Sequence, residues 1–146
     1  MKQVIIMILI LLILTGCSRI PETYQFTAPI DSIKSIELIQ NNNPNGEGTN
    51  EEFFVILKSL DKTDSEDFMH AVYEIPTKRV GTPPPWGYGP YFARVTYSNG
   101  DIDILGVWNL EFIESGTSPS GVGDYKFADD KFEQLFFEYA ELCEMQ

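Results

Sequence analysis

The chain has 146 residues, of which 43% are hydrophobic, and this length is enough for one domain with a hydrophobic core. With 22 acidic against 10 basic residues, its formal net charge is −12 at pH 7. A surface this acidic repels the phosphates of nucleic acids and of anionic lipid headgroups, so it argues against a nucleic-acid partner and favours solubility or a cationic partner.

An apolar run opens the chain and extends without interruption from Val4 to Leu14, with Lys2 as the single charge before it. A transmembrane helix needs about 20 apolar residues, so this run is too short to span a bilayer. A helix packed on a core would show a polar face, and this segment has none. Its length and its leading basic residue are typical of a secretory signal peptide.

The run ends in Leu14-Thr15-Gly16-Cys17, with small residues directly before the cysteine. This segment resembles the signal peptide and lipobox of bacterial lipoproteins. The resemblance implies that residues 1–16 are removed and that the Cys17 sulfur receives a diacylglyceryl group. Acyl chains such as palmitate would then anchor the protein at the cell membrane or outer membrane, on the extracytoplasmic side. In its general layout the mature chain also resembles small bacterial lipoproteins of unknown function, a likeness that assigns no active-site residue.

The first half of the mature chain contains a tether, two strands and a helix. Residues 17–29 hold two prolines and little periodicity, so we predict a tether there, followed by a single α+β domain over residues 30–146. Strands are expected at Ile33–Gln40 and Phe53–Lys58, on either side of a polar loop. The second strand has apolar residues on both faces, which is typical of a central position in a sheet.

A helix is expected from about Asp64 to Glu74. Thr63 and Glu66 stand at the spacing of a capping box, and the acidic first turn complements the helix dipole. Pro76 disfavours helical backbone at the residue before it and so ends the helix.

A β-hairpin is the strongest local signal in the second half of the chain. Tyr91–Tyr97 and Ile102–Trp108 flank Asn99-Gly100, which suits a two-residue type I′ turn because both residues tolerate positive φ. Such a turn puts four pairs on one face: Tyr97 with Ile102, Val95 with Ile104, Ala93 with Gly106, and Tyr91 with Trp108. Asp103 is then expected on the opposite face, across from Thr96.

The chain is expected to close with a strand from Leu110 to Glu114, a short edge strand at Tyr125–Phe127 and a helix from about Asp130 to Glu144. One face of that helix is apolar and comprises Phe132, Leu135, Phe136, Tyr139 and Cys143. With Cys17 acylated, Cys143 has no disulfide partner and is interpreted as a buried structural thiol. The predicted fold is α+β, an antiparallel sheet of five or six strands with two helices packed on one face and the C-terminal helix last.

Residues for catalysis are few. His70 is the single histidine, and it lies off the apolar face of the first helix, so we expect it to be exposed. No G-x-S-x-G motif is present, and no cysteine has a histidine partner. A hydrolase that uses a carboxylate pair remains an alternative, although 22 acids prevent any pair from being named. We therefore favour a protein that is not an enzyme and needs no cofactor.

The polar loop after the first strand nearly matches the calcium-loop template D-x-[DN]-x-[DN]-G-x5-E. Asn41, Asn43 and Asn45 would supply side-chain oxygens, Gly46 the sharp turn and Glu52 a bidentate carboxylate, which are ligands that calcium prefers. The first position is asparagine rather than aspartate, a proline stiffens the loop, and strands flank it instead of helices. The competing interpretation is a polar turn between strands.

A loop rich in proline, glycine and aromatic residues runs from Thr82 to Tyr91. Its side chains Trp86, Tyr88 and Tyr91 could stack on a sugar ring, a peptide or a partner protein of the cell envelope, or fold back over the sheet. The sequence thus favours a non-catalytic binding or protein-interaction module, with the hydrolase and a calcium-stabilised module as alternatives.

Overall fold

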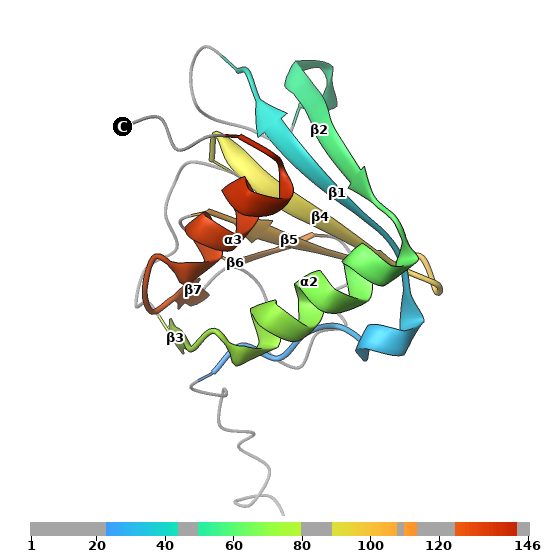
Figure 1. Ribbon diagram of the computed structural model, residues 1–146, viewed down its shortest axis with the longest axis vertical. Coiled ribbons are helices and arrows are strands. Elements are labelled where there is room, and N and C mark those ends of the chain that lie inside the picture. Colours follow the sequence, from blue (N-terminus) through green and yellow to red (C-terminus); the bar gives the residue numbers. More distant parts are fainter. Residues whose placement is uncertain (1–22, 44–49, 80–88, 108–109, 114–124, 143–146) are drawn as a thin grey trace, which may run out of the picture.

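The structure is a computed structural model that describes residues 23–43, 50–79, 89–107, 110–113 and 125–142 (Figure 1). Several residues of the sequence predictions lie outside these ranges, namely Cys17, Asn45, Trp86, Tyr88 and Cys143. Within the described residues, no helix is both long enough and apolar enough to cross a membrane.

The fold is α+β and is built on one antiparallel sheet, as expected. The described strands lie in the order β2-β1-β4-β5-β6-β7-β3. Their bounds are Ile33–Asn41 (β1), Phe54–Leu60 (β2), Thr77–Arg79 (β3), Tyr91–Tyr97 (β4), Ile102–Gly106 (β5), Leu110–Ile113 (β6) and Tyr125–Phe127 (β7). The sheet thus has seven described strands, whereas five or six were predicted. The strand that the sequence pattern did not predict is β3, which has three residues and follows Pro76.

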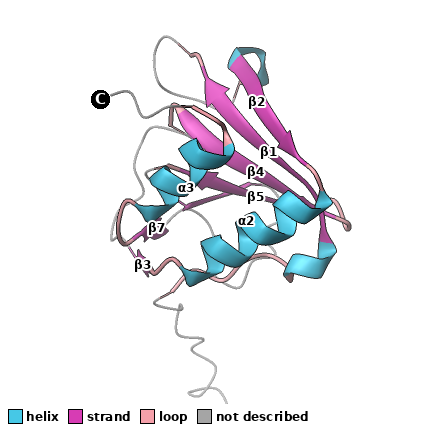
Figure 2. Ribbon diagram, in the orientation of Figure 1, coloured by secondary structure: helices cyan, strands magenta, loops and turns pink. Residues whose placement is uncertain are grey.

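The helices α2 (Lys62–Glu74) and α3 (Lys131–Tyr139) lie on the same face of the sheet, which confirms the predicted layers (Figure 2). Two 3-10 turns, η1 (Ile30–Ser32) and η2 (Glu51–Phe53), precede β1 and β2. The main core lies between helices and sheet and includes Phe68, Val72, Phe132 and Phe136 from the helices and Ile36, Leu38, Ala93, Val95 and Leu105 from the strands.

Helix α2 ends as predicted but begins earlier. Its N-cap is Asp61, whose Oδ1 accepts a hydrogen bond from the backbone N–H of Asp64 at 2.9 Å. The predicted cap at Thr63 is wrong, because Asp61 has extended backbone and caps a helix as well as threonine does. The last helical residue is Glu74, two positions before Pro76.

Helix α3 is shorter than the predicted Asp130–Glu144. It ends at Tyr139, and Glu141 follows in the left-handed region with φ of 56°. The backbone N–H of Leu142 then donates to the carbonyl oxygen of Phe137 at 3.1 Å, a bond typical of a left-handed helix end. The predicted extension of the helix to Glu144 is therefore wrong, and Cys143 lies outside the described residues.

Strand β2 is an edge strand, which contradicts its predicted central position. Val55 and Ile56 are 44% and 50% exposed, so apolar residues on both faces did not indicate burial on both faces. Pairing with β1 is irregular beside Leu57, where the register shifts between Leu38 and Ile39. Such a bulge is common on sheet edges and limits pairing with further strands.

The hairpin of β4 and β5 forms at the predicted place with a different register. Gly100 has φ of 92°, and the Tyr97 N–H donates to the carbonyl of Asp101 at 2.9 Å, so the loop has three residues instead of two. A left-handed glycine at the end of such a loop is a usual alternative to the type I′ turn. Val95 consequently pairs with Asp103, where the prediction had paired Val95 with Ile104.

This shift of one residue moves every side chain of β5 to the other face of the sheet. Ile104, predicted to share a face with Val95, joins a separate buried cluster with Ile39 and Phe92. Asp103, predicted across from Thr96, lies on the face that carries the helices. The turn thus places a carboxylate inside the protein.

Candidate functional site

Asp103 is fully buried, and its carboxylate accepts four hydrogen bonds. Its Oδ1 accepts from the Tyr24 hydroxyl at 3.1 Å and from the Thr27 hydroxyl at 2.6 Å. Its Oδ2 accepts from the Tyr97 hydroxyl at 2.7 Å and from the Thr27 backbone N–H at 3.0 Å. Because a buried carboxylate needs such donors, these bonds explain how the charge is tolerated in the core.

Three of these bonds come from residues 23–29, a segment that we call the strap. The Tyr24 backbone N–H also donates to Thr77 Oγ1 at 2.8 Å, which ties the strap to β3. Tyr24 is buried in the main core, and Phe26 packs against it. The predicted tether over residues 17–29 is therefore wrong for the strap, which belongs to the folded domain.

The phenols of Tyr24 and Tyr97 are both close to the Asp103 carboxylate. Burial raises the pKa of each phenol above its usual range, and the charge of Asp103 raises it further. Each pKa is higher in the folded than in the unfolded protein, where it is about 10. The folded state therefore favours the protonated phenols, and their contribution to stability is complete below about pH 10 and is lost above it.

We expect alkaline unfolding as a consequence. Above pH 10, the free energy of unfolding should fall by up to about 1.4 kcal/mol per pH unit for each of the two phenols, because only the unfolded chain ionises. Urea unfolding followed by circular dichroism from pH 8 to 11.5 measures this slope. The Tyr24→Phe and Tyr97→Phe double variant should lose most of it, and an unchanged slope in that variant would contradict the assignment.

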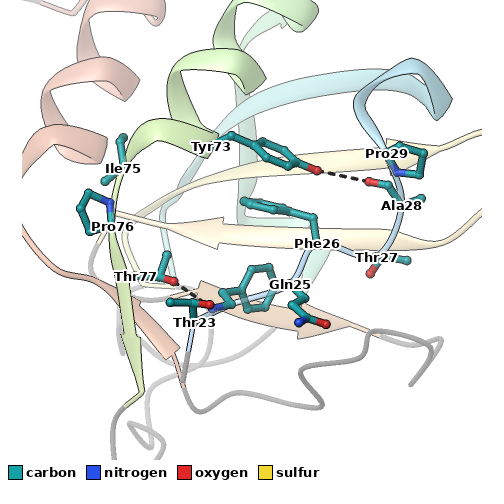
Figure 3. Close-up of a pocket in the computed structure, with 11 residues that line it drawn as sticks. Thr23, Gln25, Phe26, Thr27, Ala28, Pro29, Tyr73, Ile75, Pro76 and Thr77 are labelled. Atoms are coloured by element: carbon teal, nitrogen blue, oxygen red, sulfur yellow. Dashed lines mark hydrogen bonds between the residues drawn. The ribbon is translucent and has the colours of Figure 1, made fainter. Parts of the chain in front are cut away.

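The strap forms one wall of a groove with a volume of about 560 Å³ (Figure 3). The other wall comprises Tyr73 from the last turn of α2 and Ile75–Thr77, which lead into β3. Tyr24 and Ile75 are buried, whereas Thr23, Gln25 and Pro29 on the strap are exposed. Two segments that are about 50 residues apart in the sequence are thus brought face to face, as the bond between Tyr24 and Thr77 shows.

Two stacked aromatic rings join the walls of the groove. The Phe26 and Tyr73 rings are 4.4 Å apart at an interplanar angle of 20°. The Tyr73 hydroxyl donates to the carbonyl oxygen of Ala28 at 3.4 Å, and the Tyr24 ring meets Phe26 edge-on at 5.0 Å. Tyr73 nevertheless remains 44% exposed. These contacts fix the orientation of an aromatic side chain that is open to solvent.

Among the residues that the structure describes, those that line the groove carry no charge. They combine aromatic rings with threonine hydroxyls, a glutamine amide and prolines, in a chain whose net charge is −12. Such a surface offers stacking and neutral hydrogen bonds but neither a general acid nor a general base of ordinary pKa.

The predicted aromatic site is only partly described. Tyr91 begins β4 and is half-buried, and its ring packs against Phe136 at 6.0 Å and Phe137 at 5.2 Å. This contact with α3 corresponds to the alternative in which the aromatics of the loop complete the core. Trp86 and Tyr88 lie outside the described residues, so a joint site of the three side chains stays a prediction.

The predicted calcium ligands are also only partly described. Asn41 ends β1, is nearly buried, and accepts a hydrogen bond from the Asn43 N–H through its Oδ1 at 3.1 Å. Glu52 lies in η2 and accepts from the Asn50 amide at 2.6 Å. The part of the chain that the structure describes contains no group of three or more His, Cys, Asp or Glu residues arranged to hold a metal. The calcium site stays a prediction.

Acids gather in a second, smaller pocket of about 170 Å³ at the start of α2. Of its lining carboxylates, Asp61 caps α2, and Glu66 lies 3.8 Å from the Lys62 ammonium. His70 is exposed on α2, as expected, and does not line this pocket. The contacts of Asp61 and Glu66 are structural, Asp31 also lines the pocket, and the hydrolase alternative stays a prediction.

Sequence reasoning missed the strap groove. One signal was present, since aromatic and polar residues alternate from Tyr24 to Thr27, which is typical of an extended segment with one buried side. The two prolines within residues 17–29 outweighed this pattern and led to the tether interpretation. No local signal connected the strap with Tyr73 or Asp103.

In comparisons with known proteins, no protein-family model, curated protein or solved structure matches the chain.

Proposed function

We propose that this chain is a non-catalytic binding module that is held at the extracytoplasmic membrane surface by lipidated Cys17 and binds an uncharged ligand in the strap groove. The observation that supports it most is a groove whose described lining residues are aromatic or polar and uncharged, in a strongly acidic chain. Charged ligands gain little from walls without charge, whereas ligands with apolar faces and neutral polar groups fit them.

The groove is also preorganised. The Asp103 carboxylate and Thr77 hold the strap, and the Phe26–Tyr73 stack holds the two walls together. A ligand that binds such a site does not have to order it first, so less of the binding free energy is lost to conformational entropy. The arrangement therefore favours binding over a purely structural role for the exposed Tyr73.

The binding proposal is tested by capture of small molecules. The full chain in detergent is incubated with an envelope extract, and the retained compounds are identified by mass spectrometry. We expect uncharged compounds to be retained by the wild-type protein and lost in Gln25→Trp, which places a large ring at an exposed position of the groove lining. Ile56→Trp, at an exposed position of the distant β2 edge, is the matched control and should retain them. Equal retention by all three proteins, or retention of none, would reject the proposal.

The anchor is a separate prediction. We expect the membrane-bound protein to begin at Cys17 and to carry the mass of a diacylglyceryl group with or without a further acyl chain. Intact-mass spectrometry of the membrane fraction measures this. Cys17→Ala should leave the unprocessed precursor without lipid. An unmodified thiol at the mature N-terminus, or a precursor in the cytosol of wild-type cells, would disprove lipidation.

A further inference from the structure

We propose that the domain lies with the β3–β7 end of its sheet against the bilayer, where Lys78 and Lys126 contact the phosphates of anionic lipid headgroups. This inference rests on the lipid anchor of the proposed function and adds which surface of the domain faces the membrane. Three observations support it: the short chain between anchor and fold, the place where the strap enters the fold, and a pair of lysines at that place.

The chain between the anchor and the folded domain is short. The strap begins at Thr23 and is held by its bonds to Asp103 and Thr77. Only residues 18–22 separate Cys17 from it, and so short a segment reaches at most about 20 Å even when fully extended. A domain of this size is roughly 35 Å across, so the anchor keeps the end that carries Thr23 near the bilayer.

The strap enters the fold at the β3–β7 end of the sheet. The Tyr24 backbone N–H donates to Thr77 Oγ1 at 2.8 Å, and the Tyr24 ring meets the Tyr125 ring edge-on at 5.6 Å. Thr77 directly precedes Lys78, and Tyr125 directly precedes Lys126. In the sheet order β3 is one edge and β2 the other (Figure 1). The anchor therefore brings β3 and β7 nearer to the membrane than β2.

Two lysines lie directly across from each other at this end. Lys78 of β3 pairs with Lys126 of β7 in the antiparallel register. Tyr125 and Phe127 are part of the main core, so Lys126 between them points to the opposite face of the sheet, and Lys78 shares that face. Like charges directly opposite each other on two strands destabilise a sheet. The fold thus holds two ammonium groups where they repel each other.

Nothing within the described part of the domain neutralises this pair. Three other lysines, Lys58, Lys62 and Lys131, form ion pairs with acidic side chains, but among the described residues Lys78 and Lys126 form none. Lysine on an edge strand commonly prevents pairing with further strands, which would explain Lys78. It does not explain Lys126, because β7 lies between β6 and β3. An anionic partner outside the domain would relieve the repulsion of both.

The charge of the chain decides how the domain can approach anionic lipid. The net charge of −12 opposes contact through most of the surface, as the composition predicts. Charges are screened beyond about 8–10 Å, so the groups at the contact itself decide whether it attracts or repels. Strands β3 and β7 together contain three basic residues and no acidic one. Because each lysine near an anionic surface strengthens the attraction about fivefold, this end is the favoured contact.

The experiment measures which end of the domain faces the lipid. Lipidated protein from the membrane fraction is placed in nanodiscs of phosphatidylcholine with about one third phosphatidylglycerol, and a neutral paramagnetic chelate is attached to a few headgroups. Paramagnetic relaxation of the amide signals, followed by NMR, falls steeply with distance from the chelate. Relaxation at Lys78 and Lys126 should exceed that at Val55 on β2 at least about fivefold. This ratio should shrink at high salt or in phosphatidylcholine alone, because the attraction to headgroup charge is then lost.

Variants separate the lysine pair from the anchor. Lys78→Gln combined with Lys126→Gln should lower the relaxation ratio at least about twofold in the anionic nanodiscs. Lys34→Gln combined with Lys62→Gln is the matched control, since it removes the same charge from exposed positions beside the start of α2 and should leave the ratio unchanged. An unchanged Thr27 amide signal reports an intact strap in both proteins.

Three results would overturn the inference: equal relaxation at β2 and β3, stronger relaxation at β2, or equal ratios in the two double variants. The intact mass of the same sample separates these results from failure of the anchor. A lipidated protein with any of them leaves the anchor standing, whereas a protein without lipid overturns the anchor and this inference together. Binding in the strap groove is tested independently by the capture experiment.

Discussion

Asp103→Leu is expected to lower the free energy of unfolding by about 3–5 kcal/mol. The leucine side chain has nearly the shape of the aspartate but accepts no hydrogen bond. Four donor groups from Tyr24, Thr27 and Tyr97 would then be left without an acceptor beside a fully buried side chain. Chemical denaturation of the wild type and the variant, followed by circular dichroism, measures the difference.

Asp103→Asn is the matched control for this change. Its carbonyl oxygen can replace Oδ2, which accepts from the Thr27 backbone N–H and the Tyr97 hydroxyl. Its amide would replace Oδ1, whose two partners are hydroxyls of Tyr24 and Thr27 that can turn and accept. We therefore expect a smaller loss of about 1–2 kcal/mol.

Hydrogen exchange locates the effect of both substitutions. The Asp103 bonds hold the strap, so the amide of Thr27 should exchange much faster in Asp103→Leu than in the wild type, and more so than the amides of α2. A loss of stability below about 1 kcal/mol in Asp103→Leu, or equal acceleration along the whole chain, would show that the carboxylate does not hold the strap.

Phe132→Ala should cost about 3–5 kcal/mol of stability. Phe132 is fully buried on α3, where its ring stacks on Phe127 of β7 at 4.1 Å and meets Phe68 of α2 at 6.2 Å. It therefore joins both helices to the sheet, and its removal leaves a cavity between three elements. Because domains of this size are stable by about 5–15 kcal/mol, the variant should be close to unfolding at 37 °C.

Phe137→Ala is the control on the same helix. This residue is only half-buried and packs on Tyr91 at the edge of the core, so its loss should cost clearly less than that of Phe132. Thermal and urea unfolding of the two variants give the comparison. Equal costs, or a loss below about 1 kcal/mol for Phe132→Ala, would contradict the core described above.

Predictions that depended on periodicity were the most successful. The strand Tyr91–Tyr97 has the predicted bounds, and α2 ends where Pro76 requires. These features depend on residues that lie close together in the sequence. The prediction for β2, which depended on its neighbours in the sheet, was wrong, since its apolar residues on both faces are at an edge of the sheet.

The candidate site shows more clearly that local sequence patterns do not predict contacts between distant segments. The sequence places an aspartate after Ile102 and an aromatic segment at Tyr24–Phe26, but these lie far apart along the chain. The bond between Tyr24 and Asp103 joins residues 79 positions apart, and no local pattern indicates it. The turn at Gly100 also had two common solutions, and the one not predicted moved Asp103 into the core.

The sequence alone determined the α+β class, the places of most strands and helices, and the acidic charge, because alternation, helical spacing and composition are properties of short segments or of simple counts. The tertiary structure decided the register of the hairpin, the burial of Asp103 and the attachment of the strap to Tyr73 and Thr77. These depend on the packing of distant segments, in which a shift of one residue exchanges the two faces of a strand and so changes which groups meet.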